Sequence, residues 1–554
     1  MKTMTERRIL SDETIQNDPE PQAAVVVRSL LYVTSALYCI LLFLGLPLVF
    51  HDKYFDIGKF KYDCFFCVTA VFLIVCLFLS LLLLFLKAGG RAFDPTKVID
   101  SFKSFDIVDR AVLIYAAVCI ISYFLSPYNT WAFGYQNVIN PPLTGYPGWS
   151  MGLYSQLMFA GIYFVISRWT KQSYRRYIMG AMYFGSLAAC LLAILNRFSV
   201  DPFGFYVGVD ERYHLLFLST LGQATWYSSY LCTILPVAMA MFIYEKRTRY
   251  RSFYVVYILV GAVSLVTQNS DSAYVALAAA ILTLFAFALD RNNYFTRFFQ
   301  LILLLLLGFR LAGLLQLIFS DRAVLPGSIS LFLSQSRPML ILTVALLLIY
   351  LLFSLLQVRH DIVMSRIRSV RTILLIFAGI GILYGISALV LSTRGLRLPF
   401  LGDQEYFIFN DEWGNGRGFT WRITAEMLRD FRLPRLLFGV GPDCYSEYAY
   451  EFHTQEMLLK WGNRVLANAH NEWLNTLFTL GIAGFLSYAA IFFSAFATFI
   501  RRKNISAFSL AAAAAIASYV CHNFFCYQQV LCTPFIFAII GISASVLRSR
   551  KNIS

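Results

Sequence analysis

Residues 64–86 read CFFCVTAVFLIVCLFLSLLLLFL, an apolar run without a charged side chain. A helix of about 20 such residues crosses a hydrocarbon core roughly 30 Å thick, so this run predicts a membrane-spanning helix. Similar runs recur along the chain, which is 58% hydrophobic and only 14% charged, with a mean hydropathy of +0.64. We therefore expect an all-α, polytopic membrane helix bundle.

About fourteen runs are long and apolar enough to be predicted as spans. They cover approximately 27–50, 64–86, 107–126, 151–167, 177–196, 224–244, 252–268, 272–289, 298–319, 338–357, 371–391, 476–500, 506–525 and 530–548. They divide the chain into a cytoplasmic tail (1–26), a bundle of about eleven helices (27–391), a large extracytoplasmic loop (392–475), and about three C-terminal helices with a short cytoplasmic tail (476–554).

The net charge of +15 has a topological explanation. Basic residues gather in every second connection, for example Arg168, Lys171, Arg175 and Arg176, and again Arg548, Arg550 and Lys551. Cytoplasmic loops of membrane proteins carry an excess of lysine and arginine, so the pattern predicts that both termini are cytoplasmic. We expect membrane lipids, and no nucleic acid, as partners.

The 11 cysteines do not form a metal-binding frame. Most lie inside predicted spans, where cysteine is a small apolar filler. Cys64 and Cys67, and the group Cys521, His522, Cys526 and Cys532, have loosely ligand-like spacing, but neither forms a paired CxxC frame. We expect packing roles for both groups, and no metal or cofactor.

The large loop contains a predicted amphipathic helix. Trp421, Ala425, Leu428 and Phe431 recur at helical spacing and form an apolar stripe, while Arg422, Glu426 and Arg429 share another face. The helix is expected to end near Pro434 and to be followed by a tight turn at 439–442, GVGP. A second outer segment, 127–150, is rich in aromatic residues, which we expect either at the membrane interface or as a wall for an amphipathic ligand.

Residues 468–488, NAHNEWLNTLFTLGIAGFLSY, lead from the loop directly into a membrane helix. The polar cluster Asn468, His470, Asn471 and Glu472 is therefore expected at the outer membrane boundary. Gly481 and Gly484 have the small-residue spacing that permits close helix contact.

Four stretches together resemble the O-antigen ligase family, the Wzy_C-type lipid-linked glycan ligases and polymerases. They are STLGQATWYSSYLCTILPV (219–237), VTQNSDSAYVALAAA (266–280), WRITAEMLRDFRLPRLLFGVGPDCY (421–445) and AHNEWLNTLFTLGIAGFL (469–486). The last two are the most specific. The chain departs from the family pattern at Gln223, where asparagine is usual, and in the 266–280 turn, which lacks an arginine.

The resemblance implies a GT-C-like, metal-independent glycosyltransferase in the bacterial cytoplasmic membrane. It would transfer a glycan from a polyprenyl-diphosphate donor to a hydroxyl of a glycan, lipid or protein acceptor at the outer face. Such a reaction needs cations for the diphosphate and a base for the hydroxyl. The diphosphate candidates are Arg417 and Arg422, then Arg212, Arg394 and Arg310, and Arg310 also interrupts a predicted span, where a charge is costly.

His470 is the candidate general base, because histidine titrates near neutral pH. Asn471 or Glu472 is expected to orient it, and Asp443 to pair with an arginine or bind the acceptor. The sequence does not separate ligase, polymerase and protein glycosyltransferase, nor does it give the oligomeric state. The alternative is a lipid-linked glycan flippase or other transporter, but the two halves of the chain are not similar and the polar residues gather in one outer loop.

Overall fold

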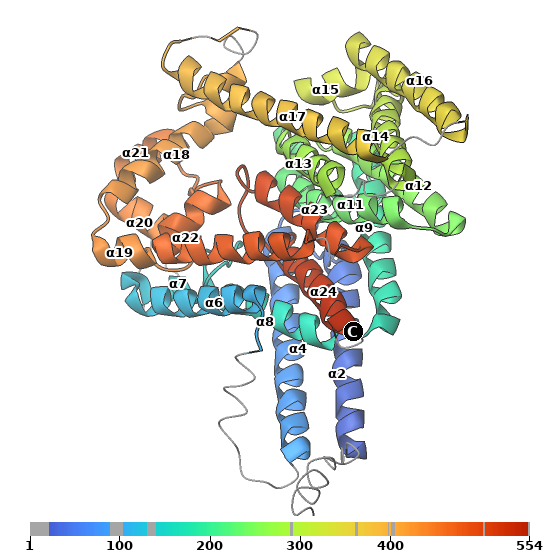
Figure 1. Ribbon diagram of the computed structural model, residues 1–554. Coiled ribbons are helices and arrows are strands. Elements are labelled where there is room, and N and C mark those ends of the chain that lie inside the picture. Colours follow the sequence, from blue (N-terminus) through green and yellow to red (C-terminus); the bar gives the residue numbers. More distant parts are fainter. Residues whose placement is uncertain are drawn as a thin grey trace, which may run out of the picture.

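The computed structural model describes residues 21–88, 104–129, 140–287, 292–359, 364–396, 398–399, 405–501 and 505–551. The protein is almost entirely helical (Figure 1). Each predicted span coincides with a helix: α2 (Gln22–Ile40), which continues through η1 (Leu41–Gly45) into α3 (Leu46–Leu48), α4 (Ile57–Ala88), α6 (Ile107–Leu125), α8 (Leu153–Trp169), α9 (Arg175–Arg197), α11 (Ala224–Tyr244), α12 (Thr248–Thr267), α13 (Ser272–Phe287), α14 (Asn292–Ile318), α16 (Arg337–Arg359), α17 (Met364–Thr393), α22 (Glu472–Phe499), α23 (Ala507–His522) and α24 (Thr533–Lys551).

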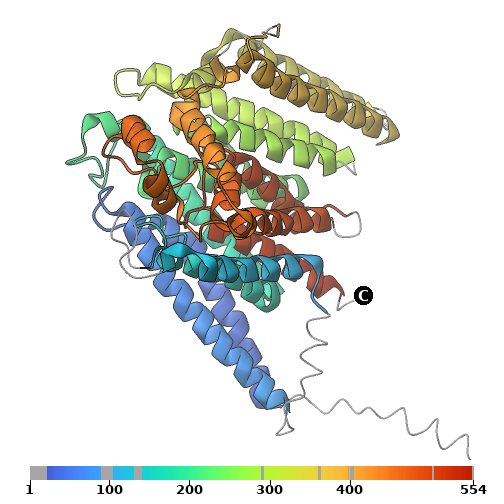
Figure 2. The same ribbon diagram turned by 90° about the vertical axis from the view of Figure 1, so that its left-hand side faces the viewer.

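Ten helical stretches in the described part of the chain are long and apolar enough to cross a membrane, and α13 and α23 are shorter apolar helices. The prediction of an all-α polytopic membrane protein is therefore confirmed. Helix α11 is its centre, because 94% of its apolar stretch is buried, compared with 6% for α17. In Figures 1 and 2, α2 and α4 pair and extend beyond the other helices, while α17 crosses one side of the bundle.

The large loop folds into four short helices: α18 (Trp413–Arg429), α19 (Leu433–Phe438), α20 (Tyr445–Phe452) and α21 (Thr454–Trp461). They enclose a small hydrophobic core of their own, separate from the main core of the bundle. The small core includes Phe419, Ile423, Met427, Tyr445 and Phe478. Other short elements in the described residues are α7 (Pro141–Thr144), α10 (Glu211–His214), α15 (Ser328–Gln335), the single turns η2 to η5, and the antiparallel strands β1 (Phe217–Leu218) and β2 (Gly222–Gln223).

The amphipathic helix predicted in the loop corresponds to α18, but its apolar stripe is only partly buried: Phe431 belongs to the small core and Leu428 packs against it. Ala425 is exposed, and the face that packs into the small core carries Thr420, Ile423, Thr424 and Met427. Two threonines can be buried because their hydroxyls are satisfied. Thr424 Oγ1 donates to the carbonyl of Thr420 at 2.6 Å and lies 2.8 Å from the hydroxyl of Tyr445. The predicted apolar stripe did not include these threonines, because threonine is a polar residue type.

The GVGP turn packs directly against α22. Gly481 has φ +67 and breaks the helix there, and a Cβ atom on it would lie 2.3 Å from the backbone of Leu437. The break frees carbonyls of α22, which accept hydrogen bonds from the backbone N–H groups of Val440 (3.3 Å) and Gly441 (2.9 Å). The predicted close approach at Gly481 is confirmed, with the loop as the partner.

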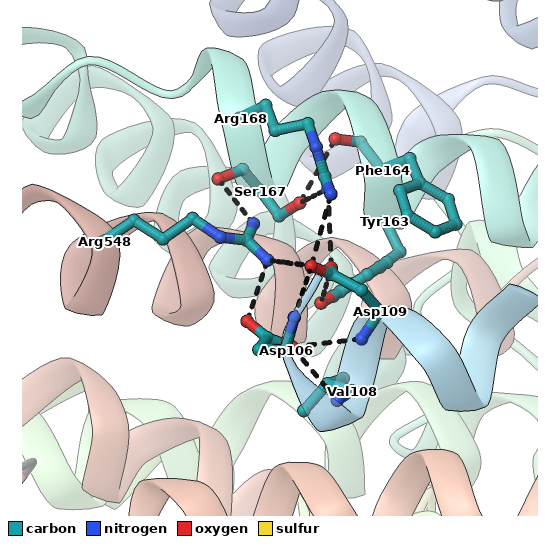
Figure 3. A network of polar contacts seen from close by, with 8 residues as sticks. All are labelled: Asp106, Val108, Asp109, Tyr163, Phe164, Ser167, Arg168 and Arg548. Carbon is teal, nitrogen blue, oxygen red and sulfur yellow. Dashed lines mark hydrogen bonds and ion pairs between the residues drawn. The ribbon is translucent and has the colours of Figure 1, made fainter. Parts of the chain in front are cut away.

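A network of charges joins α6, α8 and α24 at one end of the bundle (Figure 3). Asp109 is buried and accepts hydrogen bonds from Arg548 at 2.7 and 2.8 Å, from Arg168 at 3.2 and 3.4 Å, and from the hydroxyl of Tyr163 at 2.7 Å. Asp106 caps α6 and also accepts from Arg548 at 2.9 Å. These two carboxylates balance the two guanidinium groups and hold the three helix ends together.

Candidate functional site

Segments predicted to lie outside the membrane meet at the N-terminus of α22. His470 stands immediately before this helix with a left-handed backbone (φ +48), and its N–H donates to the side chain of Asn468 at 3.0 Å. The ring is half-buried and lies edge-on to Tyr527, with 5.3 Å between ring centroids. Among the described residues, neither ring nitrogen has a hydrogen-bond partner, so the imidazole is open to a ligand.

Arg417 lies close to His470 because of an unusual turn within α18. Residues 414–416 all have positive φ, between 61° and 86°, and this turn directs Arg417 toward the loop that follows α23. Its guanidinium donates to the carbonyls of Gly414 at 2.8 Å and Phe525 at 3.0 Å, whereas its buried Nε has no partner.

Burial and the nearby charge of Arg417 set the protonation of His470. Burial disfavours the charged imidazolium, and the guanidinium disfavours it further, so the pKa of His470 falls to about 4. The ring is therefore neutral near pH 7. A neutral imidazole beside an arginine can accept a proton while the arginine holds an anion.

Aromatic rings form one wall of the site. The hydroxyl of Tyr527 accepts from Trp226 Nε1 at 2.9 Å, and Trp149 lies edge-on to both rings. A small cavity beside Tyr527 is also lined by Asn468 and Asp443. Trp149 belongs to the aromatic outer segment 127–150, of which 130–139 lie outside the described residues. The described part of this segment therefore supplies a wall of the cavity through Trp149.

Asp443 holds the aromatic wall in place. Its Oδ2 accepts the backbone N–H groups of Tyr146 at 2.8 Å and Met151 at 2.9 Å, and these residues flank Trp149. Burial raises the pKa of Asp443 to about 7, although the two hydrogen bonds favour the carboxylate. Among the described residues its hydrogen-bond partners are these two backbone groups, and the predicted pairing with an arginine is not made there.

Asn471 and Glu472 contact groups other than the ring of His470. The side chain of Asn471 caps α22 by accepting from the N–H of Leu474 at 3.0 Å. Glu472 is buried, where its carboxylate accepts from Tyr488, Asn523 and Tyr519, the last at 2.9 and 3.0 Å. Both residues therefore fix the start of α22, which carries His470 at its entrance.

The other candidate arginines lie apart from His470, since no contact within the described part of the chain joins them. Arg422 forms a two-pronged ion pair with Asp411 (2.8 and 2.9 Å) and a second pair with Glu426. Arg212 pairs with Asp210, and Arg394 is exposed. Arg310 donates to the carbonyls of Ser334 and Ser336 at 2.8 and 2.7 Å, where it caps α15.

A second buried histidine, His522, was predicted only as packing. Its Nε2 lies 2.9 Å from the hydroxyl of Ser228 and 3.2 Å from that of Ser272, and its Nδ1 lies 3.1 Å from Asn523 Oδ1. Ser228 lies in 219–237 and Ser272 in 266–280, so a search of those motifs for hydroxyls around a histidine could have found this cluster. Where the structure describes the chain, it brings no three His, Cys, Asp or Glu side chains into a metal-binding group.

Comparison with known families agrees with this arrangement. Residues 322–489 match the family model Wzy_C, described as O-antigen ligase, and this range contains α18 to α21 and the first part of α22, with Arg417, Asp443 and His470. A comparison with curated proteins found no match. The family match confirms the resemblance predicted from the sequence: over residues 322–489 the chain is similar to the O-antigen ligase family.

Proposed function

We propose that this protein transfers an oligo- or polysaccharide from a polyprenyl-diphosphate carrier to an acceptor hydroxyl at the outer face of the bacterial cytoplasmic membrane. One observation carries the proposal: a neutral histidine, whose ring nitrogens have no partner among the described residues, lies beside an arginine that forms no ion pair there. A base and an anion ligand in one place are what this transfer needs.

In the proposed reaction, the acceptor oxygen bonds to the anomeric carbon while its proton moves to a ring nitrogen of His470. The bond between that carbon and the diphosphate oxygen breaks, and its electron pair leaves with the diphosphate. Arg417 stabilises the charge that develops on this leaving group. The proton on His470 then passes to solvent, so each turnover gives one glycoside, one polyprenyl diphosphate and one proton.

Donor binding would also strengthen the base. The charge of Arg417 contributes to the low pKa of His470, and a bound diphosphate would neutralise that charge. The pKa of His470 would then rise from about 4 toward the ordinary value of histidine, which suits general base catalysis near neutral pH. Burial, the larger cause of the low pKa, would remain, so the rise would be partial and the histidine would be a stronger base with a donor bound than without one.

The remaining arginines are proposed as secondary ligands of the diphosphate or glycan. Arg422 would have to exchange Asp411 and Glu426 for phosphate oxygens, and Arg310 would have to release two carbonyls. Arg417 also donates to two carbonyls, but among the described residues it forms no ion pair and its charge acts on His470, so we assign it the primary role.

Contacts at the two ends of the bundle support the proposed orientation. Predicted outer segments meet around His470, whereas the basic residues Arg168 and Arg548 of predicted cytoplasmic connections meet at the network of Figure 3. Both termini would then be cytoplasmic.

The proposal is tested by His470→Ala in the producing cell. We expect loss of the finished surface glycan and build-up of the lipid-linked precursor, with a normal level of the protein. His453→Ala is a matched control, because His453 lies at the junction of α20 and α21, where its ring is 3.8 Å from the carboxylate of Glu456. Unchanged glycan in the His470 variant would remove the proposed role of this residue.

The same cells separate transfer from transport. If the protein is a transferase, the accumulated precursor will be on the outer leaflet, where an added glycosidase can digest it in spheroplasts. Accumulation on the inner leaflet, protected from the enzyme, would instead support the flippase alternative.

A further inference from the structure

A second opening, which we call the α18–α21 groove, lies apart from the cavity beside Tyr527. It is lined by Glu412, Asn415 and Gly416 at the start of α18 and by Lys460, Trp461 and Arg464 at the end of α21. Its volume is about 320 Å³, within the size range of small-molecule sites. It shares no lining residue with the first cavity.

The groove carries a cation that has no carboxylate partner. Arg464 is exposed and donates to the hydroxyl of Tyr213 at 3.1 Å, and in the described residues it forms no ion pair. Lys460, by contrast, pairs with Glu412. The net charge of the groove is therefore positive, and the planar fork of Arg464 can bind a carboxylate or phosphate through two hydrogen bonds.

The rest of the lining suits a sugar ring. Gly416 brings the backbone against the indole of Trp461, and a Cβ atom there would lie 3.1 Å from its Cη2. The exposed Asn415 offers an amide to sugar hydroxyls. The C–H face of a sugar packs well on an aromatic ring, so the groove combines an apolar platform, an amide and a cation.

The groove is connected to the proposed transfer site through one turn of the chain. Residues 414–416 line the groove or flank it, and the next residue is Arg417, which donates back to the carbonyl of Gly414. A glycan whose reacting end lies at Arg417 and His470 can therefore extend toward the groove.

We propose that the α18–α21 groove binds an anionic sugar residue of the glycan substrate, with Arg464 holding its carboxylate or phosphate. The identity of the ligand as the transferred or accepting glycan rests on the proposed function. The binding of an anionic sugar itself does not depend on catalysis.

The test measures binding to the full-length protein in nanodiscs, in the His470→Ala background so that no transfer occurs. The probes are hyaluronan tetrasaccharide, which carries carboxylates, and the same tetrasaccharide after reduction of its carboxyl groups. We expect the charged probe to bind at least about tenfold more tightly, and Arg464→Gln to remove that difference. Arg429 is an exposed arginine of α18 outside the groove, so Arg429→Gln should leave the difference in affinity between the two probes unchanged.

Glucose 6-phosphate serves as a phosphate probe beside glucose, and it distinguishes a phosphorylated from a carboxylated sugar. Arg464→Lys keeps the charge but loses the fork, so it should retain only part of the preference, and its melting temperature reports folding. If neither charged probe binds better than its neutral counterpart, or if Arg464→Gln binds as before, the proposal is wrong. A wild-type protein that binds anionic sugars but transfers no glycan would contradict the proposed function alone.

Discussion

His470 combines a strained backbone with an unpartnered ring. Left-handed φ is uncommon outside glycine, although histidine adopts it more readily than most residues, and the surrounding contacts hold it here. Asn468 supplies one of them through the N–H of His470, and Tyr527 supplies another at the ring. Since the ring makes no hydrogen bond with the described protein, its protonation depends on burial and on charge.

This dependence predicts how Arg417 affects the histidine. In Arg417→Gln the pKa of His470 should rise above about 4, because a cation that disfavours the imidazolium is gone. Adding undecaprenyl diphosphate should raise it in the wild type but much less in the variant. NMR titration of ¹³C-labelled histidine, assigned with His470→Ala, measures this pKa. Equal values in the two proteins would disprove the electrostatic coupling.

Asp443 offers a second test at the level of one side chain. Asp443→Asn keeps an oxygen that accepts from the N–H groups of Tyr146 and Met151, and asparagine tolerates the left-handed φ of +59. We therefore expect the free energy of unfolding to change by less than about 1 kcal/mol. Asp443→Ala leaves two buried donors unpaired and should lower the free energy of unfolding by about 1–3 kcal/mol for each. Thermal unfolding in detergent measures both, and equal losses would show that these hydrogen bonds do not matter.

The raised pKa of Asp443 also predicts a pH dependence. The folded protein holds a proton up to about pH 7 that the unfolded chain releases near pH 4, so this residue's contribution to stability decreases as pH rises between these values. Asp443→Asn cannot titrate, and its melting temperature should fall less over that range than that of the wild type.

Buried cations in the bundle have another use besides ligand binding. Lys61 donates to the carbonyls of Leu46, Pro47 and Val49, and Arg197 donates to those of Thr267 and Leu215. Arg310 has the same kind of partners at the end of α15. A charge inside an apolar run therefore predicts a polar contact, but it does not distinguish a ligand from a helix end.

At the scale of elements, the break in α22 docks the large loop onto the bundle. The loop donates to carbonyls that a continuous helix would have used itself, and the backbones touch at Gly439 and Gly481. This places the turn before Asp443 next to the helix that begins after His470, so one contact brings together both sides of the site.

Gly481→Ala should undock the loop. The new Cβ meets the backbone of Leu437, and alanine is strained at φ +67, so we expect a loss of about 2 kcal/mol or more and faster proteolysis of the 405–471 region. Gly180→Ala is the control, because nothing lies within 4 Å of a Cβ in that helix. Equal protease resistance of the two variants would exclude this docking role.

At the scale of the whole molecule, the network of Figure 3 connects the C-terminal helix α24 to α6 and α8. In Asp109→Asn, Asp106 is the one carboxylate of the network that remains opposite the two guanidinium groups. We therefore expect the free energy of unfolding to fall by about 3 kcal/mol. Adding Arg548→Gln should recover part of it by removing an unbalanced charge. Arg176→Gln, an exposed neighbour, should change stability by less than about 0.5 kcal/mol. The melting temperatures of the three variants measure these changes. If Asp109→Asn leaves the melting temperature unchanged, the network does not hold the three helices together.

The sequence by itself determined the fold class, the helices and the resemblance to a family. Runs such as 64–86 have no low-energy alternative to a helix in lipid, where backbone groups must bond within the segment. Motif order identified the large loop and predicted His470 and Arg417, because those residue types suit the chemistry. Whether His470 performs that role stays a prediction.

Only the tertiary structure decided which polar residues share a site. It brought Arg417 to His470 through a left-handed turn, gave Arg422 and Arg310 other partners, used Asn471 and Glu472 to start α22, and placed Asp443 under the aromatic wall. Helical periodicity identified only part of the buried face next to α18, Leu428 and Phe431, and missed Thr424, whose hydroxyl is satisfied within the helix and by Tyr445. The physical reason is common to all: a sequence gives the chemistry of a side chain, but its partners come from segments distant in the chain.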